Sequence, residues 1–357
     1  MLVRKLHKAA PYGIGGKTMK TINIFLLISL CLLSSCFDDE INPLFGNFTG
    51  KDNCGWTGFN FVEDLNCFSR PCFNPNNPDE FVCIQEIFND TNSNFNDSQT
   101  IVKFNLKTKE KTVLAKVSSF YSQIDWSSIG WIAYGDNGNI YIIKDDGSEK
   151  RKINPVFAHP ACRFNEEGTK LIFRRRIDLS ASDKQRNPGL LLLRRMYIID
   201  LSGNIIDTLC IDGTKDYCGT FGIHDWRNTG FVSTYGKDGK TGIEFRNESG
   251  VLTSVIYDKR DDDKYPKDIE WNGKTDDVTY SVSNTGLMQI ISGKIRVIRH
   301  YCDKVNYGYF SVSPDGEKII AEKSLYTRIN DCSAQEEKFL VIMDIDGRNE
   351  ERIEIPE

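Results

Sequence analysis

The sequence has few histidines and little helical pattern. Only four of its 357 residues are histidine, and no segment after residue 40 shows the sustained spacing of an amphipathic helix. No Cys-x-x-Cys pair is present, which argues against a zinc site. A Gly-x-Ser-x-Gly elbow is also absent, so we expect no serine-hydrolase domain. The apolar stretch at residues 22–33 is too short to span a bilayer.

The chain has instead many short β-type segments that end in turn residues. Residues 140–143, 170–173 and 339–343 are mostly β-branched or aromatic and are bounded by Gly, Asp and Asn. Asp-Gly pairs at 146–147, 238–239, 315–316 and 346–347 supply the positive φ angles that tight hairpins need. We therefore expect an all-β protein.

One pattern recurs along the chain with a long period. Residues 311–316 read Ser-Val-Ser-Pro-Asp-Gly between two apolar runs, and residues 124–147 hold a second clear copy. Six copies can be placed by their anchor residues, which are 53, 38, 62, 45 and 41 positions apart: Phe73, Trp126, Phe164, Trp226, Trp271 and Val312. The two long gaps contain insertions, at 88–99 and 177–190. A period of about 40–45 residues with four short strands is typical of propeller blades.

The two clearest copies resemble the TolB-like propeller repeat, in which a Ser-Pro-Asp-Gly turn precedes an Ile-Tyr-x-x-Asp-x-Asp-Gly hairpin. The resemblance covers roughly residues 73–355. It implies a six-bladed β-propeller of four-stranded antiparallel blades, and the sequence leaves the choice between six and seven blades open. We assign residues 73–357 to the propeller and residues 36–72 to a tether and Cys-containing segment.

The N-terminal region has the pattern of an exported lipoprotein. Met19 begins a short basic segment, an apolar stretch follows, and residues 33–36 read Leu-Ser-Ser-Cys. We take Met19 as the start and residues 1–35 as the signal peptide. The ending resembles the bacterial lipobox, which implies that Cys36 is the mature, lipidated N-terminus; the alternative is a plain secretory signal.

The residues directly after Cys36 bear on the membrane that carries the chain. Asp38, Asp39 and Glu40 resemble the export tag of surface lipoproteins in the Bacteroidetes group. This resemblance implies an outer-membrane lipoprotein that faces the cell surface, with the periplasmic face as the alternative.

Nine cysteines remain beyond the signal peptide and the lipidation site: Cys54, Cys67, Cys72, Cys83, Cys162, Cys210, Cys218, Cys302 and Cys332. An exported protein with this many cysteines is expected to form disulfides. Cys210 with Cys218 and Cys302 with Cys332 are plausible pairs, and the first three cysteines could fasten their segment to the first blade. Since nine is odd, one thiol stays free, and we expect it to be Cys83 or Cys162.

Charge is unevenly distributed along the chain. Five of its 45 basic residues lie within 1–35, so the mature chain has 40 basic and 50 acidic residues. Residues 163–195 reverse this balance, with nine basic and four acidic residues. One hypothesis is a basic patch for an anionic partner, built on Arg174, Arg175, Arg176, Arg194 and Arg195. We favour the alternative that these charges guard an exposed sheet edge. Nucleic acid is not an expected partner of an exported acidic protein.

Histidines near the expected central channel are the first candidates for chemistry. His159, His224 and His300 each come shortly before an expected innermost strand. Some TolB-like propellers are pectate-type lyases that hold a divalent metal with channel histidines, and this resemblance makes a metal-dependent lyase or hydrolase the alternative function. The three histidines share no local motif, so we expect ordinary loop residues and no metal, cofactor or catalytic residue.

Carboxylates near the blade tryptophans are the second candidates. Four carboxylates, Asp125, Asp225, Asp268 and Glu270, come just before these tryptophans and, together with Tyr309, are expected to line the channel mouth. Paired carboxylates serve as acid and base in glycosidases, but the repeat alone places a carboxylate here in several blades. The sequence therefore predicts a non-enzymatic recognition module for a protein or glycan, tethered to the membrane by lipid, with a structural role in an envelope complex as a further possibility.

Overall fold

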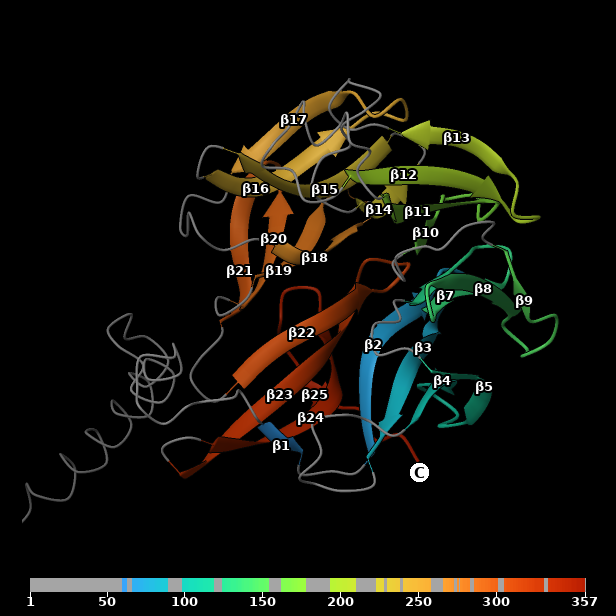
Figure 1. Ribbon diagram of the computed structural model, residues 1–357. Coiled ribbons are helices and arrows are strands. Elements are labelled where there is room, and N and C mark those ends of the chain that lie inside the picture. The colour runs from blue at the N-terminus through green and yellow to red at the C-terminus, as the bar shows by residue number, and fades with distance from the viewer. Residues whose placement is uncertain are drawn as a thin grey trace, which may run out of the picture.

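Six β-sheets stand around a common axis in the computed structural model, and the strands of each sheet follow one another along the chain (Figure 1). The structure describes residues 60–62, 66–88, 98–118, 124–153, 162–177, 193–209, 223–227, 230–237, 240–257, 266–272, 275, 277–282, 286–300, 305–330 and 333–356. Within these ranges there is no helix, and so none that is long and apolar enough to cross a membrane. The predicted six-bladed propeller of four-stranded antiparallel blades is confirmed.

The strands of the first five blades run from the channel outward in chain order. Blade 1 has β2 (Asn66–Asn74), β3 (Asn77–Ile87), β4 (Ser98–Asn105) and β5 (Lys111–Val117); blade 2 has β6 (Ile124–Trp126), β7 (Trp131–Asp136), β8 (Asn139–Lys144) and β9 (Arg151–Lys152). Blade 3 has β10 (Cys162–Phe164), β11 (Lys170–Ile177), β12 (Leu193–Asp200) and β13 (Ile205–Leu209). Blade 4 has β14 (Ile223–Arg227), β15 (Gly230–Lys237), β16 (Lys240–Arg246) and β17 (Leu252–Tyr257); blade 5 has β18 (Pro266–Trp271), β19 (Val278–Val282), β20 (Gly286–Ile291) and β21 (Lys294–His300).

Blade 6 is completed from both ends of the chain. Its inner strands are β22 (Val305–Val312), β23 (Lys318–Asn330) and β24 (Ser333–Asp344). The short strand β25 (Glu351–Arg352) pairs antiparallel with β24 at Val341 and Ile342. The strand β1 (Asn60–Val62) pairs parallel with the other end of β24, from Ala334 to Glu336. The two segments thus share the outer edge of one blade.

The predicted boundary at residue 73 was wrong. β2 already begins at Asn66 and alternates partly buried and buried residues as a half-buried strand does, and β1 lies earlier still. The tether was predicted from the Asn, Gly and Pro of residues 37–53, and the strand that follows was missed. Its pattern is interrupted by Pro71 and by a register shift between Ser69 and Cys72. Residues 1–59, which include the expected signal peptide and Cys36, lie outside the described residues.

The Ser-Pro-Asp-Gly turn shows how the repeat residues shape each blade. The Ser313 hydroxyl accepts a hydrogen bond from the Lys318 amide (2.9 Å) and donates one to Asp315 Oδ1 (2.5 Å). In blade 2 the hydroxyl of Ser127 accepts from the Trp131 amide in the same way (2.8 Å). The turn is therefore held by its first side chain.

The turn between the first and second strands of a blade and the turn between its third and fourth strands lie on the same face of the ring. The Asp145 amide, in the turn between the third and fourth strands of blade 2, donates to the Gly130 carbonyl in the turn between its first and second strands (3.1 Å). We call this the mouth face. The opposite side, where the second strand of each blade leads to the third, is the far face.

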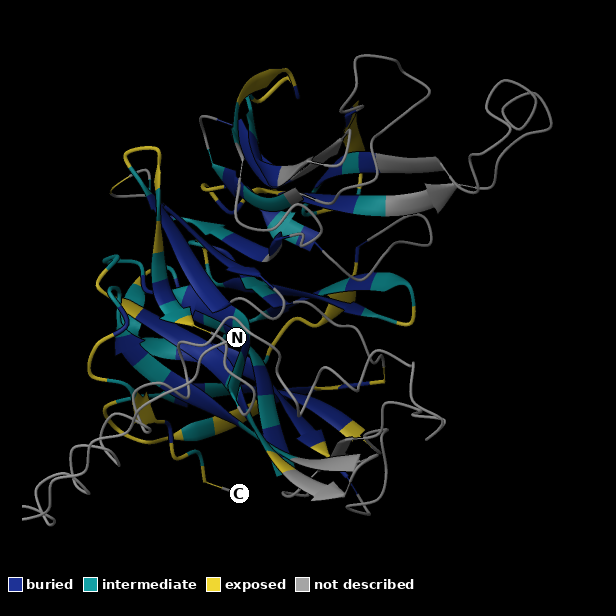
Figure 2. Cartoon of the chain, turned by 90° about the vertical axis from the view of Figure 1, so that its left-hand side faces the viewer, coloured by how far each residue is buried: buried dark blue, intermediate teal, exposed yellow. Residues whose placement is uncertain are grey.

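Apolar side chains fill the seams between neighbouring blades rather than one common centre. Each of the six main clusters joins two successive blades, as when Trp131 of blade 2 packs in one cluster with Phe164 of blade 3. Figure 2 shows the buried positions running along the strands, with exposed residues at turns. The centre of the ring is therefore free to form a cavity.

Candidate functional site

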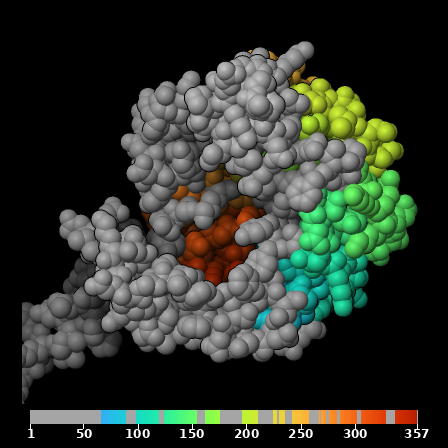
Figure 3. Space-filling view, in the orientation of Figure 1, coloured from blue at the N-terminus to red at the C-terminus, as the bar shows by residue number. Residues whose placement is uncertain are grey.

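A cavity of about 430 Å³ occupies the centre of the ring. The innermost strands of all six blades line it, together with mouth-face turn residues such as Pro75, Ser128 and Pro314. Figure 3 shows the hollow in the space-filling view, with the sixth blade visible inside it. This cavity is the candidate functional site.

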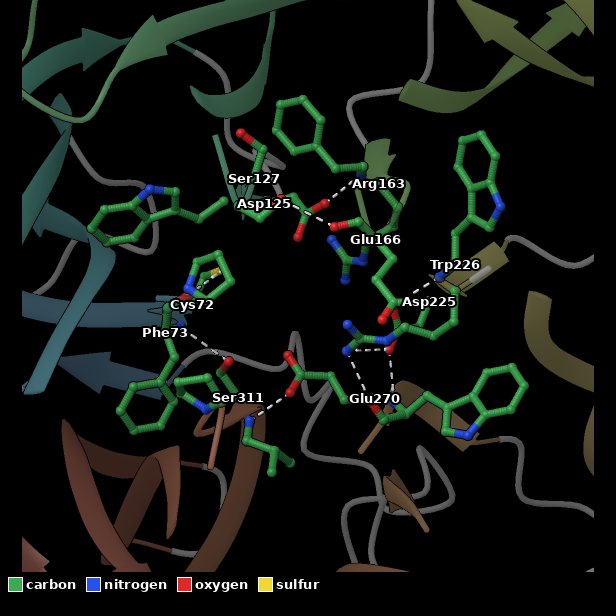
Figure 4. A pocket seen from close by; sticks show the side chains of 18 of the residues that line it. Cys72, Phe73, Asp125, Ser127, Arg163, Glu166, Asp225, Trp226, Glu270 and Ser311 are labelled. Carbon is green, nitrogen blue, oxygen red and sulfur yellow. Dashed lines mark hydrogen bonds and ion pairs between the residues drawn. The ribbon is translucent and has the colours of Figure 1, made fainter. Parts of the chain in front are cut away.

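One equivalent position in every blade forms the wall of this cavity. It is the residue directly before each anchor, and we call the set the channel ring: Cys72, Asp125, Arg163, Asp225, Glu270 and Ser311. Side chains alternate along a strand, so an anchor that packs between blades leaves its predecessor facing the channel. In Figure 4, Asp125, Arg163 and Glu270 point toward the middle while Phe73 and Trp226 point away.

Ring side chains bind the backbone of the next blade. Asp125 Oδ2 accepts a hydrogen bond from the Phe164 amide at 2.5 Å, across the seam between blades 2 and 3. Ser311 Oγ accepts one from the Phe73 amide at 3.1 Å, across the seam where blade 6 meets blade 1. We call such a contact a latch.

Blades 4 and 5 each supply a carboxylate latch of the same kind. Asp225 Oδ2 accepts from the Trp271 amide at 2.7 Å, and Glu270 Oε2 accepts from the Val312 amide at 2.5 Å. In every case the donor is the anchor residue of the following blade. The ring is thus a belt of side-chain acceptors that fastens one blade to the next.

Arg163 is the exception, because a guanidinium has no acceptor. It donates instead, from Nε to the His224 carbonyl of blade 4 (2.6 Å) and from Nη1 to its neighbour Cys162 (3.3 Å). The anchor amide of blade 4, that of Trp226, is bound by Asp225 Oδ1 of its own blade (2.8 Å). At the seam between blades 3 and 4 the ring side chain therefore donates the hydrogen bond, whereas the latches described above accept one.

Burial controls the protonation of the acids around the cavity. It raises the pKa of Asp125 to about 6 and that of Glu270 to about 8, although the nearby Arg163 guanidinium opposes both shifts. Burial also raises the pKa of Asp268. Glu270 is therefore largely protonated at neutral pH, while Asp125 is largely ionised.

His224 faces the cavity and is neutral at neutral pH. Burial, followed by the nearby Arg163 and Arg174, lowers its pKa to about 3. Its Nδ1 lies 4.0 Å from Asp268 Oδ1, which is too far for a hydrogen bond.

A smaller space of about 20 Å³ adjoins the ring. Asp268 and Tyr309 line it, as does Arg70, whose guanidinium lies 4.3 Å from the centre of the Tyr309 ring. Oδ1 of Asp268 has no hydrogen-bond partner among the described residues. The structure thus brings Asp125, Asp225, Asp268 and Tyr309 together around the channel.

The predicted histidines are not all at this site. His224 lines the cavity, but His300 ends β21, the outermost strand of blade 5, and is exposed. His159 lies outside the described residues. In the described part of the chain, no three His, Cys, Asp or Glu side chains are grouped as a metal site.

The basic segment lies at one end of blade 3. In the register of β11 and β12, Arg175 pairs with Arg195 and Arg176 with Arg194, beyond the last residues that pair with β10 and β13. The interpretation as guards of an exposed edge therefore stays a prediction, and so does the basic patch. Arg174 lies close enough to His224 to lower its pKa.

The cysteines that the structure describes add a ring residue. Cys72, Cys83 and Cys162 are free thiols, and burial raises the pKa of Cys72. The expected pairs Cys210–Cys218 and Cys302–Cys332 fall outside the described residues. Cys72, Arg163 and Ser311 were not among the predicted site residues, although the position before each anchor was the signal that could have identified them.

The chain matches no protein-family model and no curated protein. Its fold is similar to that of several solved structures. For a putative TolB from Agrobacterium tumefaciens the TM-score is 0.51 at 15% identity, over 70% of this chain and 86% of that one. For an acylaminoacyl peptidase from Pyrococcus horikoshii the TM-score is 0.55 at 14% identity, over 84% of this chain and 54% of that one.

A third similar structure is a propeller alone. The β-propeller domain of the trilobed protease from Pyrococcus furiosus gives a TM-score of 0.52 at 13% identity, over 83% of this chain and 97% of that one. The chain spans only about half the length of the Pyrococcus horikoshii peptidase. These similarities confirm the TolB-like propeller fold.

Proposed function

We propose that this chain is a lipid-anchored protein of the bacterial cell envelope whose propeller binds a protein or glycan at the mouth of its central cavity. On this proposal Cys36 carries the lipid and the propeller projects from the outer membrane, facing the cell surface. Binding does not include chemical conversion of the partner.

The latches are the observation that carries this proposal. A catalytic acid or nucleophile needs oxygens that are free to meet the reacting atoms. Here Asp125, Asp225 and Glu270 each use an oxygen to join two blades. Their primary task is structural, and the result is a stiff, polar, concave surface, which suits recognition.

A metal-dependent lyase or hydrolase was the alternative, and the described residues give it little support. It needs several histidines at one point, whereas His224 lines the cavity and His300 lies on an outer strand. We therefore treat this activity as an outcome that the binding experiment can reveal.

The anchor is tested by labelling cells with a clickable palmitate analogue. We expect label on the wild-type chain and none on Cys36→Ser, which should leave the membrane fraction. Protease added to intact cells should then digest the lipidated protein. Label that persists on Cys36→Ser would exclude this anchor, and protection from the protease would favour the periplasmic face.

Binding is tested with a photo-crosslinking amino acid placed in intact cells. Glu166 lines the cavity, whereas Val113 is exposed on the outer strand of blade 1 and serves as the control position. We expect a specific adduct from position 166 and none from position 113. Equal adducts at both positions would contradict binding at the mouth. Release of unsaturated products from acidic polysaccharide, lost in His224→Ala, would replace recognition with catalysis.

A further inference from the structure

Two carboxyl groups face each other across the central cavity. Asp125 belongs to blade 2 and Glu270 to blade 5, which are opposite blades of a six-bladed ring, and both side chains point toward the middle (Figure 4). Each uses one oxygen as a latch. The second oxygen of each makes no hydrogen bond or ion pair with a described residue. The cavity wall therefore presents two carboxyl oxygens that can accept a hydrogen bond from a ligand.

A third carboxyl group lies at the floor of the cavity. Asp268 lines the space of about 20 Å³ that shares Asp125, Arg163 and Glu270 with the main cavity. Its side chain is only 5% exposed, and its Oδ1 accepts no hydrogen bond from a described residue. Burying a carboxyl oxygen without a donor costs free energy. The floor would therefore be stabilised by a donor or a positive charge.

The arginines at this site do not fully meet that need. Arg227 pairs with Asp225 at 3.2 Å. Arg163 donates to two backbone carbonyls, and its Nη2 lies 3.7 Å from Asp268 Oδ1, which is too far for a hydrogen bond. The Arg163 guanidinium also acts on Asp125 and Glu270. One cation thus offsets only part of the charge that three carboxyl groups would carry.

Protons take the place of the missing positive charge. Burial raises the pKa of Asp125 to about 6 and that of Glu270 to about 8, and it raises the pKa of Asp268 as well. Glu270 is therefore mostly neutral at pH 7. A cation that enters the cavity stabilises the ionised form of Glu270, so binding of a cation and release of a proton are linked.

Other titratable groups surround Glu270. Those that face it are Asp225, Arg227 and His224 from β14, Arg163 from β10, Asp125 from β6, Cys72 from β2, Tyr309 from β22 and Asp268 from its own strand, β18. Burial raises the pKa of Cys72 and of Tyr309, so both stay neutral up to pH 9. His224 also stays neutral, because its pKa is about 3. Titration of this cluster above pH 7 therefore belongs mainly to Glu270, joined by Asp268.

The turns around the cavity mouth are also acidic. In the described part of the turns between first and second strands there are five acidic residues and no basic one: Glu166, Glu167, Asp277, Asp315 and Glu317. Clefts lined by charge of one sign raise the local concentration of ligands of the opposite sign. A positively charged partner is therefore attracted to the mouth before it reaches the floor.

We propose that the cavity accepts a lysine side chain from a basic segment of a partner protein. An ammonium group is a compact charge with three donors, which suits single oxygens that come from opposite blades, whereas a guanidinium prefers two oxygens in one plane. The cavity of about 430 Å³ has room for the lysine stem. The acidic turns extend the site beyond the size of a single free amine, which favours a protein segment. This inference names the partner of the proposed binding site and so rests on the proposed function.

The test is titration calorimetry on the chain that lacks residues 1–35 and carries Cys36→Ser. The probe is a short peptide of three lysines separated by glycines and blocked at both ends. The same peptide with acetylated lysines controls for charge, and one with glutamates controls for its sign. We expect only the lysine peptide to bind, with release of protons at pH 7, measured in buffers of different ionisation enthalpy. Its affinity should rise about tenfold between pH 7 and pH 9, as the ionised fraction of Glu270 does.

Two variants separate the cavity from the overall charge. Glu270→Gln keeps an acceptor for the Val312 amide and removes the charge. It should lower the affinity at pH 9 about tenfold and lose most of the rise with pH. Asp146→Asn removes a charge from an exposed outer turn and should change the affinity less than about twofold. Equal losses in the two variants, an affinity that does not depend on pH, or a preference for the glutamate peptide would each overturn the proposal.

Failure of this inference and failure of the proposed function give different results. Adducts from position 166 in cells, with no binding of the lysine peptide, would keep recognition at the mouth and reject lysine as the inserted group. Peptide binding without adducts would keep the cation site and reject a partner at the mouth. Binding of n-pentylamine as tight as that of the peptide would assign the cavity to a free amine instead of a protein segment.

Discussion

Blade 3 has two neighbours and is joined to them in different ways. On the side of blade 2, Asp125 accepts the Phe164 amide, and Ser128 Oγ donates to the Glu166 carbonyl at 3.1 Å. On the side of blade 4, Arg163 donates to the His224 carbonyl, and no carboxylate spans the seam to an anchor amide in the described residues. The same structural position thus makes opposite contacts at adjacent seams.

The outer turns repeat this contrast. A Cβ added to Gly203, in blade 3, would lie 2.1 Å from the Ile153 carbonyl oxygen at the end of blade 2. A Cβ added to Gly250, the equivalent residue of blade 4, meets no described atom within 4 Å. The seam between blades 2 and 3 is closely fitted at both its inner and outer ends. Equal repeats do not therefore produce equal seams.

The contrast between the two seams of blade 3 depends on one residue, Arg163. Its replacement should therefore have the largest effect on the free energy of unfolding. Arg163→Met leaves the buried carboxyls of Asp125 and Asp268 without their guanidinium, at a cost of about 4 kcal/mol in the free energy of unfolding at pH 8. Both pKa values, already raised, rise further in the variant. A raised folded pKa means that stability is kept at low pH and is lost as pH rises through it. The loss should therefore be smaller at pH 5.

Urea unfolding at the two pH values measures this difference. Arg352→Met is the control, because that arginine is partly exposed and pairs with Glu337, so it should cost under about 1 kcal/mol. If Arg163→Met lowered the free energy of unfolding equally at pH 5 and pH 8, the protonation of Asp125 and Asp268 would not depend on Arg163.

Gly203→Ala and Gly250→Ala compare the outer turns directly. Both glycines have positive φ, 90° and 78°, which costs an alanine roughly 1–2 kcal/mol. Among the described atoms, only the Cβ added at Gly203 clashes with a neighbouring backbone, so we expect a loss of about 3 kcal/mol there and about 1 kcal/mol at Gly250. Thermal unfolding of the two variants measures this difference. Equal shifts in Tm would mean that the outer turns are packed equally loosely at both seams.

Asp125→Ala and Asp125→Asn give the smallest predicted effects and isolate one latch. Alanine leaves the Phe164 amide without its acceptor, which should cost about 2 kcal/mol. Asparagine keeps an acceptor oxygen and removes a poorly solvated charge, so we expect it to stay within about 1 kcal/mol of the parent. Denaturant titration at pH 8 tests both. If asparagine were as costly as alanine, the charge and not the hydrogen bond would hold the seam.

The repeat made the fold predictable because its information is local. Anchors, turn residues and β-branched runs each act within about ten positions, and together they specify the blade. Asp125, Asp225 and Glu270 were also predicted from the sequence, since each directly precedes a tryptophan anchor. Their role as latches between blades could not be predicted from the sequence. Each latch joins residues far apart in the chain, and the one between Ser311 and Phe73 spans 238 positions.

The errors have the same physical origin. His300 was expected near the channel because it precedes an innermost strand, but the outer strand of blade 5 continues to include it. β1 carries no signal of its own, because three residues gain strand geometry only from the edge of β24.

The parallel pairing of β1 also determines how the molecule bears mechanical load. Since the chain enters at the far-face end of β24, a pull on the N-terminal segment acts along the strand axis and not across it. All three pairs between Asn60–Val62 and Ala334–Glu336 then resist together, in shear, where a strand pulled from its side opens one pair at a time. A short strand held in this direction therefore resists an axial pull better than a strand of equal length that is opened from its side.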